Sequence, residues 1–293
     1  MKIFITGTES FVAQALIKKL DFKGYNLTGC DTVVPSDKRF FQADIRSKTL
    51  SDKISTDIDI IVHLAALSSD PLCKGNDYSC FDINVMGTLN IMNLAKEKKC
   101  KQFIFASTEW VYENINRDDF LSEEENIDVS RINSEYALSK FVSEINLKHR
   151  HQLDFCDVTI LRFGIIYGPR NSGTAVESIF KSIYMDHELS IGSKYSGRCF
   201  LHIDDLSGAI VKSLGLKGFN ILNIVGDELI TMNDIIIISE KILGKVANFK
   251  VSNNKVVDQR KISNVLAKKM IKWRPKIDIK RGLSTIKGFH ANN

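Results

Sequence analysis

Short apolar runs alternate with amphipathic stretches through the first half of the chain. Strands are expected at the apolar runs, over Lys2–Thr6, Tyr25–Cys30, Ile58–Leu64, Phe103–Ala106 and Val158–Phe163. Between them, apolar residues recur at helical spacing over Phe11–Leu20, Asp82–Lys98 and Ser134–His149. Strands that alternate with helices need crossover connections, which predicts an α/β fold with a doubly wound parallel sheet covered on both faces.

The pattern changes after Phe163. A turn-rich segment is followed by a helical pattern over Glu177–Met185 and by short strands mixed with glycine over residues 189–205. We therefore expect a first domain over residues 1–167 and a second over 168–293, with residues 199–226 returning to the first through a strand at Phe219–Val225. The stretch from Ile115 to Ile132, rich in Asp, Glu and Asn, is expected to be an exposed loop.

Polar or small residues follow the expected strands, where sheets of this kind bind their ligands. The first strand leads into Gly7, where a dinucleotide site places the first glycine of its phosphate-binding turn. Ser10 and Ala13 stand where the other two glycines of that pattern would be, and Ser10 puts a side chain where backbone and phosphate approach closely. An ordinary strand–turn–helix explains the segment equally well.

Two carboxylates lie at later strand ends. Asp31 ends the second strand, where a carboxylate can accept hydrogen bonds from ribose hydroxyls and would repel a 2′-phosphate, favouring NAD over NADP. A turn-capping role is the alternative. Asp44 and Ile45 follow the next apolar stretch and can lie beside an adenine, or Asp44 can be a plain surface residue.

A tyrosine and a lysine stand one helical turn apart in the segment SEYALSK. Tyr136 and Lys140 would share a helix face, and the cation would lower the pKa of the phenol. Thr108, at the end of an upstream apolar run, can hydrogen-bond the same oxygen. This arrangement suits interconversion of an alcohol and a ketone, although such a pair on a lysine-rich helix can also be simply solvated.

Composition narrows the choice of partners. The net charge of +5 comes without a dense basic stripe, so no nucleic-acid partner is expected. We also expect no membrane association, because no apolar stretch approaches the ~20 residues of a membrane helix. Six cysteines without C-x-x-C spacing predict reduced thiols in a cytoplasmic protein, with no disulfide framework and no metal site.

Several segments in order match one family. They are DIDIIVHLAA, FDINVMGTLNIMNLA, FIFASTEWVY, YALSK, VTILRFGIIYGPR, RCFLHIDDL and KKMIKWRPKIDIKRGL. With these, the chain resembles the extended short-chain dehydrogenase/reductases, specifically the NAD-dependent epimerase/dehydratase group that acts on nucleotide sugars. The resemblance covers nearly the whole length and implies a Rossmann-type dinucleotide-binding domain followed by a smaller substrate-binding lobe.

The resemblance also implies roles for single residues. Tyr136 is the expected acid/base, Lys140 holds the nicotinamide ribose, and Thr108 binds the reacting hydroxyl. The residues expected at NAD are Gly7, Ser10, Phe11, Val12, Asp31, Asp44, Ile45, Leu64, Ala65, Ala66, Tyr136, Lys140 and Phe163. Those expected at a nucleotide-diphosphate sugar are Ser68, Thr108, Glu109, Trp110 and Arg198. A surface or interlobe role is the alternative for Arg198.

The leading hypothesis is an NAD-dependent epimerase that works through a transient keto sugar. The segment from Ser107 to Tyr112 is similar to that of keto-sugar reductases, which is the second hypothesis, and a non-catalytic dinucleotide-binding regulator is the third. Dehydratases of the family carry Asp-Glu where this chain has Glu109-Trp110, which disfavours 4,6-dehydration. Ile165 replaces a substrate-contacting Asn, and family analogy implies a homodimer formed by the helices over Asp82–Lys98 and Ser134–His149.

Overall fold

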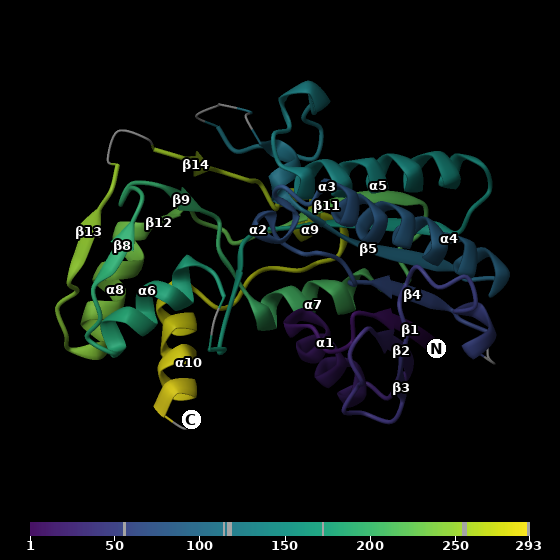
Figure 1. Ribbon diagram of the computed structural model, residues 1–293, viewed down its shortest axis with the longest axis horizontal. Helices are drawn as coiled ribbons and strands as arrows, with labels where there is room; N and C mark the ends of the chain where they lie inside the picture. The colour runs from purple at the N-terminus through teal and green to yellow at the C-terminus, as the bar shows by residue number, and fades with distance from the viewer. Residues whose placement is uncertain (55–56, 114, 116–118, 172, 254–256, 292–293) are drawn as a thin grey trace. The chain divides into compact units, whose positions relative to one another are not determined.

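A seven-stranded sheet organises the first part of the chain in this computed structural model (Figure 1). Its order is β11-β6-β5-β4-β1-β2-β3. The strands are β1 (Lys2–Thr6), β2 (Asn26–Asp31), β3 (Phe40–Gln42), β4 (Ile60–His63), β5 (Gln102–Thr108), β6 (Asp157–Phe163) and β11 (Phe219–Ile224). Chain order reverses between β1 and β4, which is the switch point of a doubly wound sheet. The expected Rossmann-type fold is confirmed.

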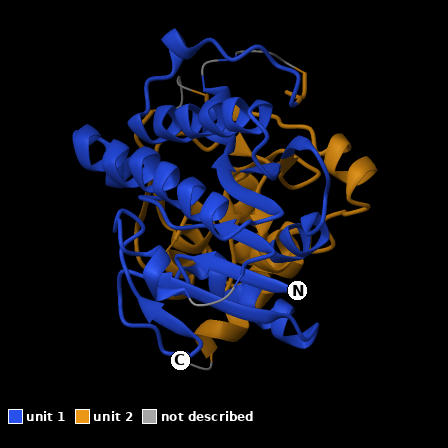
Figure 2. Ribbon diagram, turned by 90° about the vertical axis from the view of Figure 1, so that its right-hand side faces the viewer, with its two compact units in different colours: residues 1–116, 123–162, 207–222 blue, residues 117–122, 163–206, 223–293 orange. Residues whose placement is uncertain are grey.

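The structure describes residues 1–54, 57–113, 115, 119–171, 173–253 and 257–291. These fall into two compact units, shown in two colours in Figure 2. The first unit comprises residues 1–116, 123–162 and 207–222, and the second comprises 117–122, 163–206 and 223–293. The chain therefore returns to the first unit after leaving it, and the strand expected at Phe219–Val225 is confirmed as β11.

Helices connect the strands of the first unit. They are α1 (Phe11–Phe22), α2 (Asp70–Cys73), α3 (Asp77–Phe81), α4 (Gly87–Glu97) and α5 (Glu135–Gln152). Helix α5 begins where expected because the Ser134 hydroxyl accepts a hydrogen bond from the Ala137 amide (3.2 Å). The helix expected over Asp82–Lys98 opens instead with a π-helical turn, Asp82–Met86. Helix α7 (Ile203–Ser213) leads back into the first unit.

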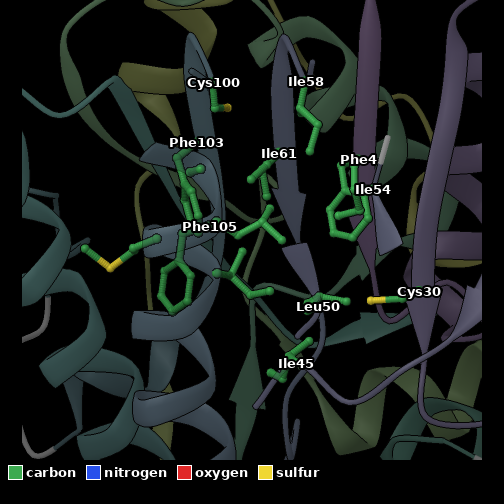
Figure 3. Packing of buried hydrophobic residues seen from close by; sticks show 14 of the residues in the cluster. Phe4, Cys30, Ile45, Leu50, Ile54, Ile58, Ile61, Cys100, Phe103 and Phe105 are labelled. Atoms are coloured by element: carbon green, nitrogen blue, oxygen red, sulfur yellow. The ribbon is translucent and has the colours of Figure 1, made fainter. Parts of the chain in front are cut away.

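The core of the first unit lies on the face of the sheet seen in Figure 3. Phe4, Phe103 and Phe105 are fully buried, and the side chain of Ile61 lies among them. These residues come from the runs that the sequence marks as strands. The strand β3 was not expected, because three residues are too few to give a sequence pattern. Only its first residue, Phe40, is buried.

The second unit contains α6 (Ala175–Tyr184), α8 (Met232–Leu243), α9 (Val265–Met270) and α10 (Ile279–Ala291). Its short strands are β7 (Ile166–Tyr167), β8 (Leu189–Ile191), β9 (Gly197–Arg198), β10 (Leu201–His202), β12 (Ile230–Thr231), β13 (Phe249–Val251) and β14 (Gln259–Arg260). They form the pairs β10–β7 and β13–β8 and the three-stranded sheet β12-β9-β14. Phe180, Ile235 and Leu283 pack into its core.

Part of the stretch expected to be an exposed loop is buried. Leu121 is 3% exposed and forms a parallel bridge with Ile262, with the Leu121 amide donating to the Lys261 carbonyl (2.9 Å). Residues 116–118 of the stretch lie outside the described residues. An apolar residue inside an acidic run is the signal that marks this contact.

Candidate active site

Four strand ends meet at the carboxyl edge of the sheet. Register pairs Thr6 with Cys30 on one side and with His63 on the other, and His63 with Phe105. The residues that follow, Gly7 after β1 and the segment 64–66 after β4, therefore lie at one edge together with Thr108 at the end of β5. This edge is where an open α/β sheet binds its ligand.

Gly7 is fixed by both conformation and space. Its φ is +76°, and a Cβ there would lie 2.9 Å from the backbone nitrogen of Ala65. The Thr6 hydroxyl oxygen accepts from the amides of Leu64 (3.2 Å) and Ala65 (3.1 Å), which holds β1 against β4 at this point. Only glycine allows the two backbones to approach in this way.

His63, the last residue of β4, contacts two threonines near this edge. The sequence pattern did not indicate it. Its Nδ1 lies 2.7 Å from the Thr6 hydroxyl and its Nε2 lies 3.0 Å from the Thr88 hydroxyl. Complete burial lowers its pKa to about 3, so the ring is neutral and links the two threonines. Thr6 and His63 are polar residues at the ends of two apolar runs, and this is the sequence feature that could have indicated their contact.

Ser10 caps α1 with its side chain. Its φ is −70° and its hydroxyl accepts from the Ala13 amide (3.2 Å), so the side chain turns back onto the helix. The replacement of glycine therefore needs no unusual backbone. Phe11 and Val12 are the first two residues of α1, and their amides point out of the N-terminus of the helix.

Asp31 joins β2 to this turn. Its carboxylate accepts from the Glu9 amide (2.9 Å) and from the Val33 amide (3.2 Å). The turn-capping role left open by the sequence is thus present, and the side chain remains partly exposed. Within the described residues the Thr8 hydroxyl is buried beside it without a hydrogen-bond partner.

Asp44 and Ile45 are placed near the same edge. The Ala43 amide donates to the Asp31 carbonyl (2.8 Å), which brings the segment to the end of β2. Hydrogen bonds from Arg46 lower the pKa of the Asp44 carboxyl, and Arg46 also reaches Asp82 (2.5 Å). The Ile45 side chain is buried in the core, so any contact that this residue makes with an adenine must come from its backbone.

Thr108 is the polar side chain that acts on Tyr136. The Thr108 hydroxyl oxygen accepts from the Trp110 amide (3.2 Å) and caps the short helix Glu109–Tyr112. The Thr108 side chain also lowers the pKa of Tyr136, the direction that favours the phenolate. Lys140, one turn along α5, donates to the Ala106 carbonyl (2.8 Å) and lies over the Phe105 ring.

The expected lowering of the pKa of Tyr136 by Lys140 is wrong. Burial raises the pKa of Tyr136 to about 12, against the smaller opposite effect of Thr108. Burial also lowers the pKa of Lys140 to about 7, which the nearby Glu144 carboxylate partly opposes. Desolvation acts against both charged forms, and the lysine is bonded to a backbone carbonyl.

The remaining substrate candidates divide between the units. Trp110 packs with Leu67 against Tyr136, Glu109 is buried next to it, and Ser68 is exposed. Arg198 and Phe163 belong to the second unit. There, Arg198 donates to the Asp258 carboxylate and to the Asp258 carbonyl (2.8 Å), while Phe163 ends β6.

A disulfide packs against the same tyrosine and corrects a prediction. Cys73 on α2 and Cys80 on α3 are bonded, with their Cα atoms 5.2 Å apart, whereas the sequence predicted reduced thiols. Both are fully buried, and Tyr136 lies in the same cluster. The Asn84 side-chain amide binds the Leu67 backbone (2.8 and 3.1 Å) and the Ser139 hydroxyl (2.9 Å) around this cluster. The pairing depends on two short helices that the sequence pattern did not indicate.

In the part of the chain that the structure describes, no group of three or more His, Cys, Asp or Glu side chains is arranged to hold a metal ion. The described helices also include none with the length and apolar character needed to cross a membrane.

Comparison with known proteins identifies the family. Residues 3–224 match the model of the NAD dependent epimerase/dehydratase family. The chain belongs to this family. A UDP-glucuronate 4-epimerase of Thermodesulfobacterium geofontis is 31% identical over 268 residues, which cover 87% of this chain and 80% of the relative. A putative UDP-glucose 4-epimerase of Methanocaldococcus jannaschii is 28% identical, with 99% of each chain covered.

Solved structures of family members agree with the fold. The UDP-glucuronic acid 4-epimerase of Bacillus cereus, in complex with UDP-glucuronic acid and NAD, superposes with a TM-score of 0.86 at 26% identity, covering 100% of this chain and 99% of that one. The UDP-glucose 4-epimerase of Thermotoga maritima gives a TM-score of 0.90 at 22% identity, covering 100% and 99%.

The residues present fit the NAD of this epimerase/dehydratase family. Gly7 lets the turn after β1 pack directly against the Ala65 backbone, and the first amides of α1 point out of the helix beside this turn. The Thr8 hydroxyl has no partner among the described residues, and the Asp31 carboxylate is partly exposed. Together they supply hydrogen-bond donors for a diphosphate and an acceptor for a ribose.

Proposed function

We propose that this chain is an NAD-dependent epimerase that inverts C4 of a UDP-linked sugar, with UDP-glucuronate as the first substrate to test. The observation that carries the proposal is the placement of Tyr136 and Lys140 one turn apart on α5, together with Thr108 at the end of β5, whose side chain acts on the Tyr136 phenol. The UDP-glucuronate 4-epimerase relative at 31% identity supports the choice of substrate.

The chain's own residues divide the work. Tyr136 as phenolate accepts the proton of the sugar hydroxyl and later returns a proton to the reduced carbonyl oxygen. Thr108 holds that hydroxyl, and Lys140, charged at or below a pH of about 7, supplies a cation one turn from the phenol. Bound NAD⁺ would supply a hydride acceptor that returns the hydride to the opposite face, together with a positive charge that favours the phenolate.

The proposal also includes the binding residues that the sequence predicts. Gly7, Ser10, Phe11, Val12, Asp31, Asp44, Ile45, Leu64, Ala65, Ala66 and Phe163 would contact NAD. Ser68, Glu109, Trp110 and Arg198 would contact the nucleotide sugar. Of these residues, Phe163 and Arg198 belong to the second unit and the others to the first.

The test uses purified protein, added NAD⁺ and UDP-glucuronate, with NMR of the sugar protons as the readout. Tyr136→Phe is expected to lower kcat about 10²- to 10⁴-fold, since it removes the acid/base oxygen. Tyr195→Phe, at a half-exposed tyrosine of the second unit, is the matched control and should leave the rate unchanged. Equal turnover by Tyr136→Phe and the unmodified protein would exclude the mechanism.

Product analysis separates the alternatives. An epimerase forms the C4 epimer with no net change in absorbance of the reduced nicotinamide. A keto-sugar reductase consumes NADH stoichiometrically with an added keto sugar. Several relatives are UDP-glucuronic acid decarboxylases, and that activity would release CO2 and leave a UDP-pentose. If the protein epimerises UDP-glucose but not UDP-glucuronate, the proposed reaction stands and the proposed substrate is wrong.

We also infer a homodimer formed through the faces of α4 and α5. Met86, just before α4, and Ile145 on α5 are 56% and 51% exposed, so both side chains are accessible to a second copy of the chain. Ile145→Asp should shift the molar mass in light scattering from dimer to monomer. Phe22→Asp, at a 93% exposed residue ending α1, is the matched control and should leave the dimer intact. A monomeric unmodified protein at micromolar concentration would contradict the inference.

A cytoplasmic location completes the proposal. Cys30, Cys100 and Cys156 are not part of a disulfide, which is typical of a reducing compartment. In such a compartment the Cys73–Cys80 disulfide would have to resist reduction by cellular thiols. Alkylation of the protein in rapidly quenched cells would measure the fraction of this pair that is reduced.

A further inference from the structure

A buried ion pair lies behind the candidate active site in the first unit. Arg162 on β6 donates from Nε to Glu144 Oε1 (3.0 Å) and from Nη2 to Glu144 Oε2 (2.6 Å). The two side chains are 3% and 2% exposed. A pair this deeply buried costs desolvation energy, so it is weak evidence for a role in stability alone. Its other partners indicate what it does.

The pair contacts the chain on both sides of Thr108. Ser107, which precedes Thr108 on β5, donates its hydroxyl proton to the Glu144 carboxylate. Tyr112 ends the short helix that Thr108 caps, and its hydroxyl accepts from Arg162 Nη1 (2.8 Å). The guanidinium also lies over the Tyr112 ring, which is fully buried. The backbone that carries Thr108 is therefore held at both ends.

The same pair is attached to the helix of the tyrosine. Tyr136, Lys140 and Glu144 follow one another at four-residue spacing along α5, so they lie on one side of that helix. Glu144 thus fixes α5 relative to the Thr108 segment at a point two turns from Tyr136. Thr108 at the end of β5 and Tyr136 on α5 thus belong to the two elements that the ion pair joins, and the Thr108 side chain acts on the Tyr136 phenol.

We propose that Glu144 and Arg162 are positioning residues that hold the Thr108 hydroxyl against the Tyr136 oxygen, acting through Ser107 and Tyr112. The proposal rests on the function proposed above. It predicts that weakening the network changes catalysis only while the Thr108 hydroxyl is present, because the network acts through that group. Glu144 also attracts the buried Lys140 cation, which lies one turn away on the same helix.

Removing a charge of the pair could unfold the protein, so the test uses Tyr112→Phe, which deletes one hydroxyl and keeps the ring over Arg162. Alone, this variant should lower kcat for UDP-glucuronate about 5- to 20-fold with KM changed less than about 2-fold. In a Thr108→Val background the same substitution should change kcat by less than about 2-fold. The loss of thermal stability should be the same in both backgrounds. Tyr195→Phe is again the control.

Equal factors in the two backgrounds, or a change in stability without a change in kcat, would overturn the proposal. Its failure is separable from failure of the epimerase assignment by NMR of ¹³C-labelled tyrosine at neutral pH, which needs no turnover. Loosening the Thr108 contact should shift the ring-carbon resonance of Tyr136 in Tyr112→Phe, and the substitution should cause no further shift in the Thr108→Val background. An unchanged Tyr136 resonance in Tyr112→Phe would count against the positioning role whatever the substrate is.

Discussion

Tyr136 and Lys140 each carry a proton whose affinity depends on burial. Desolvation raises the pKa of the phenol to about 12 and lowers the pKa of the ammonium to about 7. The two shifts have one cause, since an apolar surrounding disfavours either charged form. In the mechanism proposed above, the Tyr136 phenolate would therefore need a further cation, such as the one that bound NAD⁺ would supply.

The burial of Lys140 predicts a pH-dependent effect on stability. The folded protein loses this proton at a pH of about 7 and the unfolded chain near ~10.4, so the unfolded chain binds more protons in between. The stability contributed by this site rises with pH across that window and is lost as the pH falls toward 7. Lys140→Met should thus raise the free energy of unfolding by on the order of 4–5 kcal/mol at pH 6, and by much less at pH 10.

Urea unfolding at both pH values measures this difference. Lys148→Met, on the exposed side of the same helix, is the control and should show no such dependence. A gain from Lys140→Met that is the same at pH 6 and pH 10 would show that the lysine titrates normally in the folded protein.

At the scale of elements, the start of α1 shows how a serine can stand where a dinucleotide-binding pattern usually has glycine. Ser10 accepts from the Ala13 amide and leaves its backbone in an ordinary extended conformation. Ser10→Ala should cost about 1 kcal/mol of unfolding free energy through loss of the cap, whereas Ser10→Gly should cost only a few tenths. Thermal unfolding of the two variants separates the cap from the backbone.

The same pair of variants tests the turn as a cofactor site. Because the serine side chain faces the helix, Ser10→Gly should change the dissociation constant of NAD⁺ by less than about 3-fold, measured by calorimetry. A gain of tenfold or more on introducing glycine would mean that the hydroxymethyl group obstructs the diphosphate.

Some elements could be predicted from the sequence and others could not. Long buried strands and capped helices follow from local patterns, so β1 and β5 could be predicted within two residues and α5 within three. Strand β3 is too short to give a pattern, and the cysteines on α2 and α3 are joined only because two short helices fold together. The pKa of Tyr136 could not be predicted from its spacing to Lys140, because burial outweighs a neighbouring charge that is bonded elsewhere. The site assignments carried over from the family stay predictions.

At the scale of the whole molecule, the two units are interleaved along the chain. The first unit needs residues 207–222, which arrive after the chain has passed through the second unit. Gln102, at the start of β5, is a buried anchor for this returning segment. Its side-chain amide donates to the Ser213 carbonyl (2.8 Å) and its carbonyl accepts from the Gly215 amide (2.7 Å). Neither unit is therefore available as one continuous stretch of sequence.

Gln102→Leu fills the same space and leaves the backbone groups of Ser213 and Gly215 without these partners. A buried backbone group without a partner costs about 1–3 kcal/mol, so the variant should lose about 2–4 kcal/mol of unfolding free energy. Hydrogen exchange should show the largest loss of protection over residues 207–222 and a smaller loss in β1, because the damage begins where the returning segment is anchored. Gln152→Leu, at the exposed end of α5, is the control and should change neither quantity. A uniform loss of protection through the first unit would mean that the returning segment unfolds only with the whole sheet, and the anchor would then be one contact of a single cooperative core.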